Sequence, residues 1–80
     1  MAKLFTPLKL RDIEVRNRIF IAPMCQYSCE DQDGVVNDWH QVHYISRSVG
    51  GAGMIIAEAT AVTPEGRITP WCAGIWGEEH

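Results

Sequence analysis

Two short segments of this 80-residue sequence carry the side chains best suited to chemistry. The first, residues 22–27 (APMCQY), places a thiol and a phenol directly after a short apolar run. Cys25 suits a nucleophile, a metal ligand or a weak hydrogen-bond donor to a cofactor, and equally a small buried hydrophobe. Tyr27 suits either a wall residue or a hydroxyl that positions a polar substrate. Because α/β proteins carry their sites at the carboxyl ends of strands, this position favours a functional role.

The second segment, residues 58–61 (EATA), follows another apolar run. A carboxylate directly after buried residues needs a partner, and we expect Glu58 to form an ion pair with an arginine rather than to transfer protons. Ala59 has a minimal side chain, which would let a planar ligand approach the backbone. The two segments therefore predict one polar, thiol-containing site at neighbouring strand ends.

A metal site is a third candidate, because His40 and His43 lie close to Cys29 in the sequence. On a helix the two imidazoles would stand about 60° apart around the axis, and the spacing to Cys29 matches no common zinc site. The sequence thus predicts no metal ligands, with a solvated His40 and a half-buried, hydrogen-bonded His43.

The elements that would position these residues follow from the hydrophobic pattern. Apolar and polar residues alternate over residues 7–15, which predicts a hairpin that turns at Arg11 and Asp12. Continuous apolar runs at residues 19–22 and 53–57 predict two strands buried on both faces, as parallel strands usually are. Residues 28–37 predict a surface loop, and residues 63–66 (TPEG) a tight turn.

A helix is expected between the two buried strands. Asp38, followed three residues later by Gln41, fits a capping box, and Gly50-Gly51 supply a left-handed stop. At 100° of rotation per residue, one face of this helix carries mostly apolar side chains and should pack on an apolar surface. The members of this apolar stripe are Trp39, Val42, Ile45, Ser46 and Val49.

Strand, helix and strand in this order predict a right-handed parallel crossover and an α/β fold. The glycine-rich residues 50–53 precede a strand, whereas the dinucleotide fingerprint follows one, so a Rossmann site is excluded. Two parallel strands cannot provide each other with neighbours on both edges. We therefore expect these residues to form the first part of a larger α/β domain.

Composition narrows the class of partner. The formal charge is −3, and no Lys/Arg cluster supports nucleic-acid binding. No apolar run approaches the roughly 20 residues that span a bilayer, and no secretion signal is visible, so we expect no membrane partner. The three cysteines cannot all pair internally, which predicts free thiols and a cytoplasmic protein.

Several separated motifs, in order, closely resemble the Old Yellow Enzyme family of flavin-dependent ene-reductases. Cys25 followed by Gln26 and Tyr27 is similar to the bacterial, thermophilic-like subclass that includes xenobiotic reductases. The motifs are LFTP at 4–7, VRNRI at 15–19, APMCQY at 22–27, DWH at 38–40, EATAV at 58–62 and GRI at 66–68.

The resemblance implies a TIM barrel, typically of about 250 residues, whose lower mouth the hairpin closes. Residues 1–80 would be the N-terminal part of one FMN-binding domain, a hairpin plus the first βαβ unit, with the barrel incomplete in this chain. FMN would lie across the strand ends, accept hydride from NADPH and pass it to the β-carbon of an α,β-unsaturated carbonyl compound. A homo-oligomer is expected, because relatives in the subclass form dimers or tetramers.

The resemblance also implies site residues. Ala22, Pro23, Met24, Cys25 and Ala59 would contact the isoalloxazine of FMN. Cys25 stands where other members carry Thr, so it would tune the flavin potential through a weaker hydrogen bond. Relatives often carry a hydroxyl where this chain has Ala22, which leaves only backbone contacts there. Tyr27 would line the substrate side.

No catalytic residue is expected within this chain. The family's paired substrate-binding residues, proton-donating tyrosine and phosphate-binding loops would lie beyond His80. Two alternatives remain open: a non-catalytic fragment or structural module that completes a barrel with another chain, and a sister flavin reductase of dienoyl thioesters or amines, which would also carry an iron–sulfur cluster.

Overall fold

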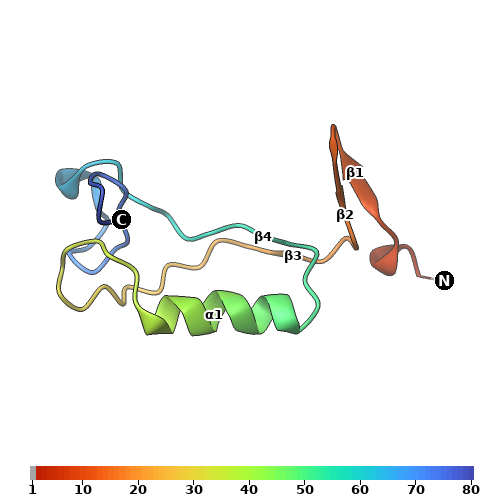
Figure 1. The fold of residues 1–80 in the computed structure, drawn as a ribbon, viewed down its shortest axis with the longest axis horizontal. Coiled ribbons are helices and arrows are strands. Elements are labelled where there is room, and N and C mark those ends of the chain that lie inside the picture. Colours follow the sequence, from red (N-terminus) through yellow and green to blue (C-terminus); the bar gives the residue numbers. More distant parts are fainter. Residues whose placement is uncertain (1) are drawn as a thin grey trace.

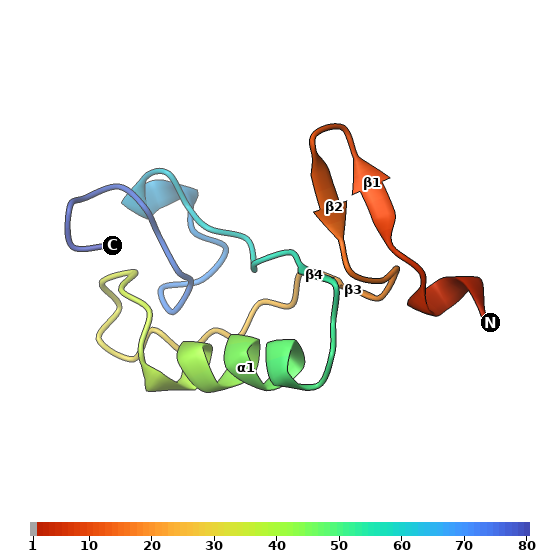
Figure 2. The same cartoon turned by 45° about the vertical axis from the view of Figure 1, so that its right-hand side comes forward.

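The chain starts with a short turn and a hairpin. The computed structural model describes residues 2–80, beginning with a 3-10 turn at Lys3–Phe5. Strands β1 (Leu8–Leu10) and β2 (Ile13–Val15) pair antiparallel, with Leu8 opposite Val15. The turn places Arg11 at a φ of 53°. The predicted hairpin is confirmed, and it projects from one end of the molecule (Figures 1 and 2).

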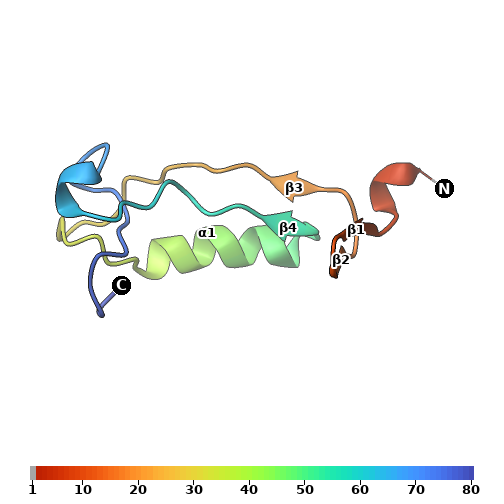
Figure 3. The same cartoon turned by 90° about the horizontal axis from the view of Figure 1, so that it is seen from above.

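The body of the molecule is one crossover unit. Strand β3 (Phe20–Ile21) leads through a long loop into helix α1 (Asp38–Val49), and the chain returns along β4 (Met54–Ile55). The two strands are parallel neighbours, and α1 runs alongside them (Figure 3). The predicted strand–helix–strand order and the α/β class are confirmed, although the regular strands are shorter than expected.

Contacts before β3 and after α1 fix the strand register. The backbone N–H of Gly53 donates to the carbonyl of Ile19 at 2.9 Å, and the Asn17 side chain donates to the carbonyl of Gly51 at 2.7 Å. A Cβ at position 53 would lie 2.5 Å from the Asn17 backbone oxygen, so only glycine allows this approach. Gly51, at a φ of 112°, supplies the predicted left-handed stop of the helix.

The first turn of α1 is capped differently from the sequence prediction. The N-cap is Asn37, whose side-chain oxygen accepts the backbone N–H of Trp39 at 3.0 Å. The reciprocal bond of the capping box comes from His40, whose Nδ1 accepts the Asn37 N–H at 3.0 Å. The predicted pair, Asp38 and Gln41, was wrong by one position because histidine can fill the accepting role normally given to Glu or Gln.

The helix also presents the opposite face from the one predicted. Val42 and Ile45 of the apolar stripe are each 57% exposed, and Val49 is 82% exposed. The inward face carries His40 and His43, which are 1% and 3% exposed. The stripe was expected to pack on the strands, and this expectation was wrong because the strand ends offer a carboxylate rather than an apolar surface, as described below.

Little apolar surface is buried by residues 2–80. The strands are not buried on both faces as predicted: Phe20 is 39% exposed, and Ile21, Met54 and Ile55 are only partly covered. The Cα radius of gyration is 15.0 Å, against about 12 Å for a compact domain of this length. Within residues 2–80, α1 alone covers these strands, on one face. The buried apolar residues described are Val15, Cys29, Cys72 and Ala73.

The remaining residues fold back over the far end of the strands. A 3-10 turn at Pro64–Gly66 confirms the predicted tight turn, and Thr63 caps it by accepting the Gly66 N–H at 3.1 Å. An isolated parallel bridge then joins Ala61 to Gly74. Among the residues described, no helix has the length and apolarity needed to cross a membrane.

Replacing Asn37 by alanine should lower the free energy of unfolding by about 1 kcal/mol, because the N-cap acceptor is lost. Asp38→Ala is the matched control and should cost less than half as much, since Asp38 acts only through the helix dipole. Urea unfolding of the purified variants measures both. Equal losses would restore Asp38 as the cap.

Candidate functional site

The two candidate segments lie side by side. Parallel pairing sets Phe20 opposite Met54 and Ile21 opposite Ile55, and the Ile56 N–H donates to the Ile21 carbonyl at 3.0 Å. Residues 22–27 and 58–61 therefore leave the same end of the strand pair (Figure 3). The predicted juxtaposition of these segments is confirmed.

The segment after β3 is largely open to solvent. Ala22, Pro23, Met24 and Tyr27 are exposed, whereas Cys25 is half-buried. The pKa of the Tyr27 hydroxyl is raised, chiefly by its electrostatic interaction with Cys25 and secondly by desolvation. Cys25 and Tyr27 are therefore neighbours at the open edge of the site.

The segment after β4 is open above a small hollow. Ala59 and Thr60 are exposed, and the Thr60 hydroxyl donates to the Glu58 carbonyl at 2.8 Å. Ala59 also lines a hollow of about 70 Å³ together with Arg67 and Cys72. That volume is far below the 300–1,000 Å³ of ordinary ligand pockets, so residues 2–80 present a surface at this point and not an enclosed cavity.

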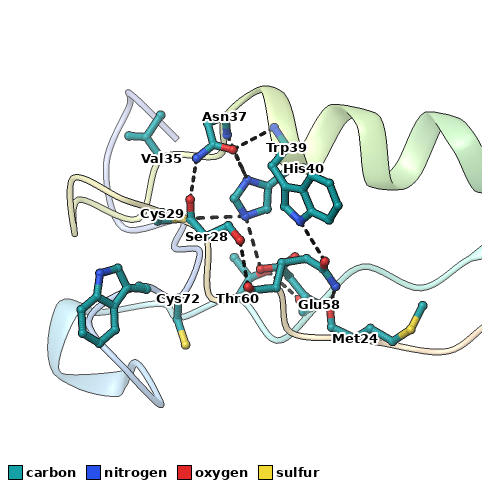
Figure 4. Close-up of polar contacts among 12 residues, drawn as sticks. Met24, Ser28, Cys29, Val35, Asn37, Trp39, His40, Glu58, Thr60 and Cys72 are labelled. Atoms are coloured by element: carbon teal, nitrogen blue, oxygen red, sulfur yellow. Dashed lines mark hydrogen bonds and ion pairs between the residues drawn. The ribbon is translucent and has the colours of Figure 1, made fainter.

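Glu58 is buried beneath this surface, and its partners come from α1. The Tyr44 hydroxyl donates to Oε2 of Glu58 at 3.1 Å and accepts the Glu58 backbone N–H at 3.0 Å. Nε2 of His40 lies 3.6 Å from Oε1 (Figure 4). The expected arginine partner was wrong, because the helix face that packs here supplies a phenol and an imidazole instead.

Hydrogen bonds assign the tautomer of His40. The Asn37 backbone N–H can only donate, so Nδ1 of His40 accepts it, and the proton of a neutral ring is assigned to Nε2, toward Glu58. Nδ1 also lies 3.1 Å from the Asn37 side-chain oxygen. The Cys29 sulfur is 3.9 Å from the same Nε2. His40 was expected in solvent and is instead almost fully buried. The expectation failed because the helix turns its polar face inward.

Burial leaves two of these groups protonated. Desolvation raises the pKa of the Cys29 thiol, and nearby Glu58 adds to the effect. Desolvation is also the main cause of the raised pKa of Tyr44, whose hydroxyl therefore keeps the proton that it donates to Glu58. Cys29 is thus unsuited to act as a thiolate nucleophile.

His43 is fully buried rather than half-buried, with its ring edge-on to Tyr44 at 5.0 Å between centroids. Cys29 and His40 do approach one another, yet residues 2–80 contain no group of three or more His, Cys, Asp or Glu side chains able to hold a metal. The imidazoles of α1 are packing and hydrogen-bonding groups in this structure.

A clamp formed by Arg67 was missed at the sequence level. Its guanidinium donates to the carbonyls of Gln32 at 2.7 Å and Pro70 at 3.0 Å, and it lies 5.2 Å from the centre of the Trp76 ring. These contacts tie the loop before α1 to the end of the chain. Periodicity carries no signal for them, because all of these groups lie in irregular loops.

Replacing Tyr44 by phenylalanine should lower the free energy of unfolding by about 1–3 kcal/mol. The substitution leaves the buried carboxylate and the backbone N–H of Glu58 without the hydrogen-bond partner that the Tyr44 hydroxyl provides. Tyr27→Phe removes the same hydroxyl from an exposed position and should change stability by less than about 0.5 kcal/mol. Denaturant unfolding of both variants checks this. Similar losses in the two would contradict the proposed partnership with Glu58.

Known proteins resemble this chain over nearly all of its length. The NADPH dehydrogenase of Bacillus subtilis (strain 168) is 51% identical over 78 residues, which cover 98% of this chain and 23% of that protein. The NADPH dehydrogenase of Listeria welshimeri is 49% identical over 80 residues, covering 100% of this chain and 24% of that protein. The chain thus spans about a quarter of the length of these curated relatives.

Solved structures agree with the fold. Morphinone reductase superposes with a TM-score of 0.83 at 36% identity, over 95% of this chain and 19% of that one. The Old Yellow Enzyme homologue from Zymomonas mobilis gives 0.85 at 32% identity, over 98% and 21% of the two chains.

A family model agrees with both comparisons. The model described as the NADH:flavin oxidoreductase / NADH oxidase family matches residues 3–80. The resemblance drawn from separated motifs is thereby confirmed, and the chain belongs to the NADH:flavin oxidoreductase / NADH oxidase family.

Proposed function

We propose that this chain supplies one wall of the FMN site in an NADPH-dependent oxidoreductase that reduces the activated C=C bond of α,β-unsaturated carbonyl compounds. One observation carries the proposal: the exposed residues 22–24 and Ala59, with the half-buried Cys25 beside them, lie at adjacent parallel strand ends in a chain of a flavin oxidoreductase family. The names of the relatives, NADPH dehydrogenases, support NADPH as the reductant.

The residues present fit a flat aromatic ring system. Ala22 and Ala59 are exposed and have minimal side chains, and Pro23 lacks an N–H that would need a partner. Met24 is 41% exposed and can adapt its flexible side chain to an aromatic face. A planar ring can therefore approach the backbone at both strand ends.

Each side chain has a role that its chemistry allows. Bound FMN would supply hydride transfer between NADPH and the unsaturated substrate. Residues 22–24 and Ala59 would exclude water from one side of the ring. The half-buried Cys25 would act as a weak donor to it, and the exposed Tyr27 would direct its hydroxyl toward the substrate. We assign no catalytic residue and no metal ligand to this chain.

We further propose that β3 and β4 are the first two strands of a TIM barrel, with residues 1–80 forming the N-terminal part of a single FMN-binding domain. The parallel pair, the helix alongside it and the hairpin at the opposite end from the site all fit this arrangement. Exposed apolar residues on β3 and α1 are the surfaces that further strands and helices would cover.

Visible absorption, intact mass and NADPH oxidation with cyclohexenone test the function. Purified protein that carries this sequence should show a flavin band and cyclohexenone-dependent NADPH oxidation. An isolated 9.0 kDa chain given FMN should not oxidise NADPH, because it contains no assigned catalytic residue. A full-length protein that binds no added FMN would overturn the proposal.

The same preparation separates the alternatives. Bound iron together with activity on a dienoyl thioester would indicate the sister class of flavin reductases. A stable complex with another polypeptide in size-exclusion chromatography, without flavin, would indicate a structural module. A homo-oligomer with flavin is the result we expect.

Cys25→Ala should make the FMN potential more negative by roughly 10–20 mV while FMN stays bound. The thiol is a weak donor to the electron-rich reduced ring, and 30 mV corresponds to about 1.4 kcal/mol for a two-electron couple. Spectroelectrochemical titration measures the shift, with Cys72→Ala as the control at a buried thiol. An unchanged potential would remove Cys25 from this role.

A further inference from the structure

Tyr27 adopts a backbone conformation that L-residues rarely take. Its φ is 51°, in the left-handed region, although it is neither glycine nor asparagine. Such a conformation costs free energy and persists only where neighbouring contacts impose it. Tyr27 itself is 47% exposed, so packing of its own side chain is not what imposes it.

The residue before Tyr27 is held by a bridge to helix α1. The Gln26 side chain donates through Nε2 to the Met24 carbonyl at 2.8 Å. Its other end, Oε1, accepts the indole N–H of Trp39 at 2.9 Å. Since Gln26 uses its donor and its acceptor at once, it connects the loop backbone to the first turn of the helix.

The residue after Tyr27 is held from the same turn. The Ser28 hydroxyl donates to the Gln26 carbonyl at 2.8 Å, and the Ser28 carbonyl accepts from the Asn37 side chain. Tyr27 is therefore flanked on both sides by residues anchored at the start of α1. The helix end dictates the direction in which the loop presents its exposed side chains.

Trp39 is placed for this contact rather than for packing. It is 50% exposed on a helix whose inward face is formed by other residues, so burial of its ring explains little of its position. Its one polar atom, in contrast, is used by Gln26. Indole nitrogen is a donor only, and it matches the acceptor end of the glutamine side chain.

We propose that Trp39 is a positioning residue that acts through Gln26 to hold Tyr27, and with it Cys25, in the orientation that the reaction uses. The inference rests on the proposed function, since it names what fixes the substrate-facing loop of that site. Trp39 does not itself touch the reacting atoms.

Three variants test the inference in purified, flavin-loaded protein. Trp39→Phe removes the indole N–H but keeps an aromatic ring, Gln26→Met removes both ends of the bridge, and the double variant removes both partners. Trp71→Phe is the matched control: Trp71 is 44% exposed, and its hydrogen bond to the Thr69 hydroxyl is made by the backbone N–H, which the substitution keeps.

The KM for cyclohexenone should rise in Trp39→Phe by roughly two- to tenfold, the size expected from losing one neutral hydrogen bond, with kcat changed much less. Gln26→Met should do the same, and the double variant should be no worse than the more affected single variant. An unchanged KM, or effects that multiply in the double variant, would overturn the inference. Trp71→Phe should leave KM as it is.

A second measurement keeps the inference testable if the proposed function fails. The rate of Cys25 alkylation by iodoacetamide, followed by peptide mass spectrometry, should rise by roughly two- to tenfold in Trp39→Phe, since one hydrogen bond no longer restrains the loop. The buried Cys29 serves as an internal standard. Unchanged alkylation of Cys25 would overturn the inference even in protein that binds no flavin, whereas missing flavin with faster alkylation would overturn only the proposed function.

Discussion

The buried carboxylate of Glu58 determines how helix α1 lies on the strands. A charged group with 5% of its surface exposed must be satisfied by hydrogen bonds, and the nearest element able to supply them is α1. Tyr44 and His40 both point to this carboxylate, so the polar face of the helix turns inward. The apolar stripe, which would otherwise have been the natural packing face, is left outside.

This orientation links the helix to both candidate segments. Contacts to Glu58 fix the helix against the end of β4, directly before Ala59. The first turn of the same helix reaches the other segment, through Trp39 to Gln26 and through Asn37 to Ser28. Helix α1 thus sets the position of both strand-end loops, although each loop is irregular by itself.

The open surfaces of the chain agree with its family. Four apolar residues are buried among those described, while β3 and the outer face of α1 leave large apolar side chains exposed. The matched relatives are about four times as long, since the chain spans 23% of the first. Under the proposed barrel, further strands and helices would cover these surfaces, and the flavin would cover the strand ends.

The sequence by itself determined the elements and the identity of the family. The hairpin, the helix, the two parallel strands and the juxtaposition of the two candidate segments follow from local hydrophobic periods and turn residues, which depend on near neighbours in the chain. The flavin family was recognisable because six short motifs occur in the same order.

Only the tertiary structure decided which side chains cap the helix, contact Glu58 and become buried. Local pattern favoured Asp38 as the cap, an arginine beside Glu58 and a solvated His40, whereas the fold selected Asn37, Tyr44 and a buried His40. The left-handed Tyr27 and its anchoring through Gln26 to Trp39 were likewise invisible. The cap depends on His40 three residues further on, whereas the partners of Glu58 and the anchoring of Tyr27 depend on groups brought together from distant positions. Satisfying a buried carboxylate thus outweighed the packing that the helix period alone would favour.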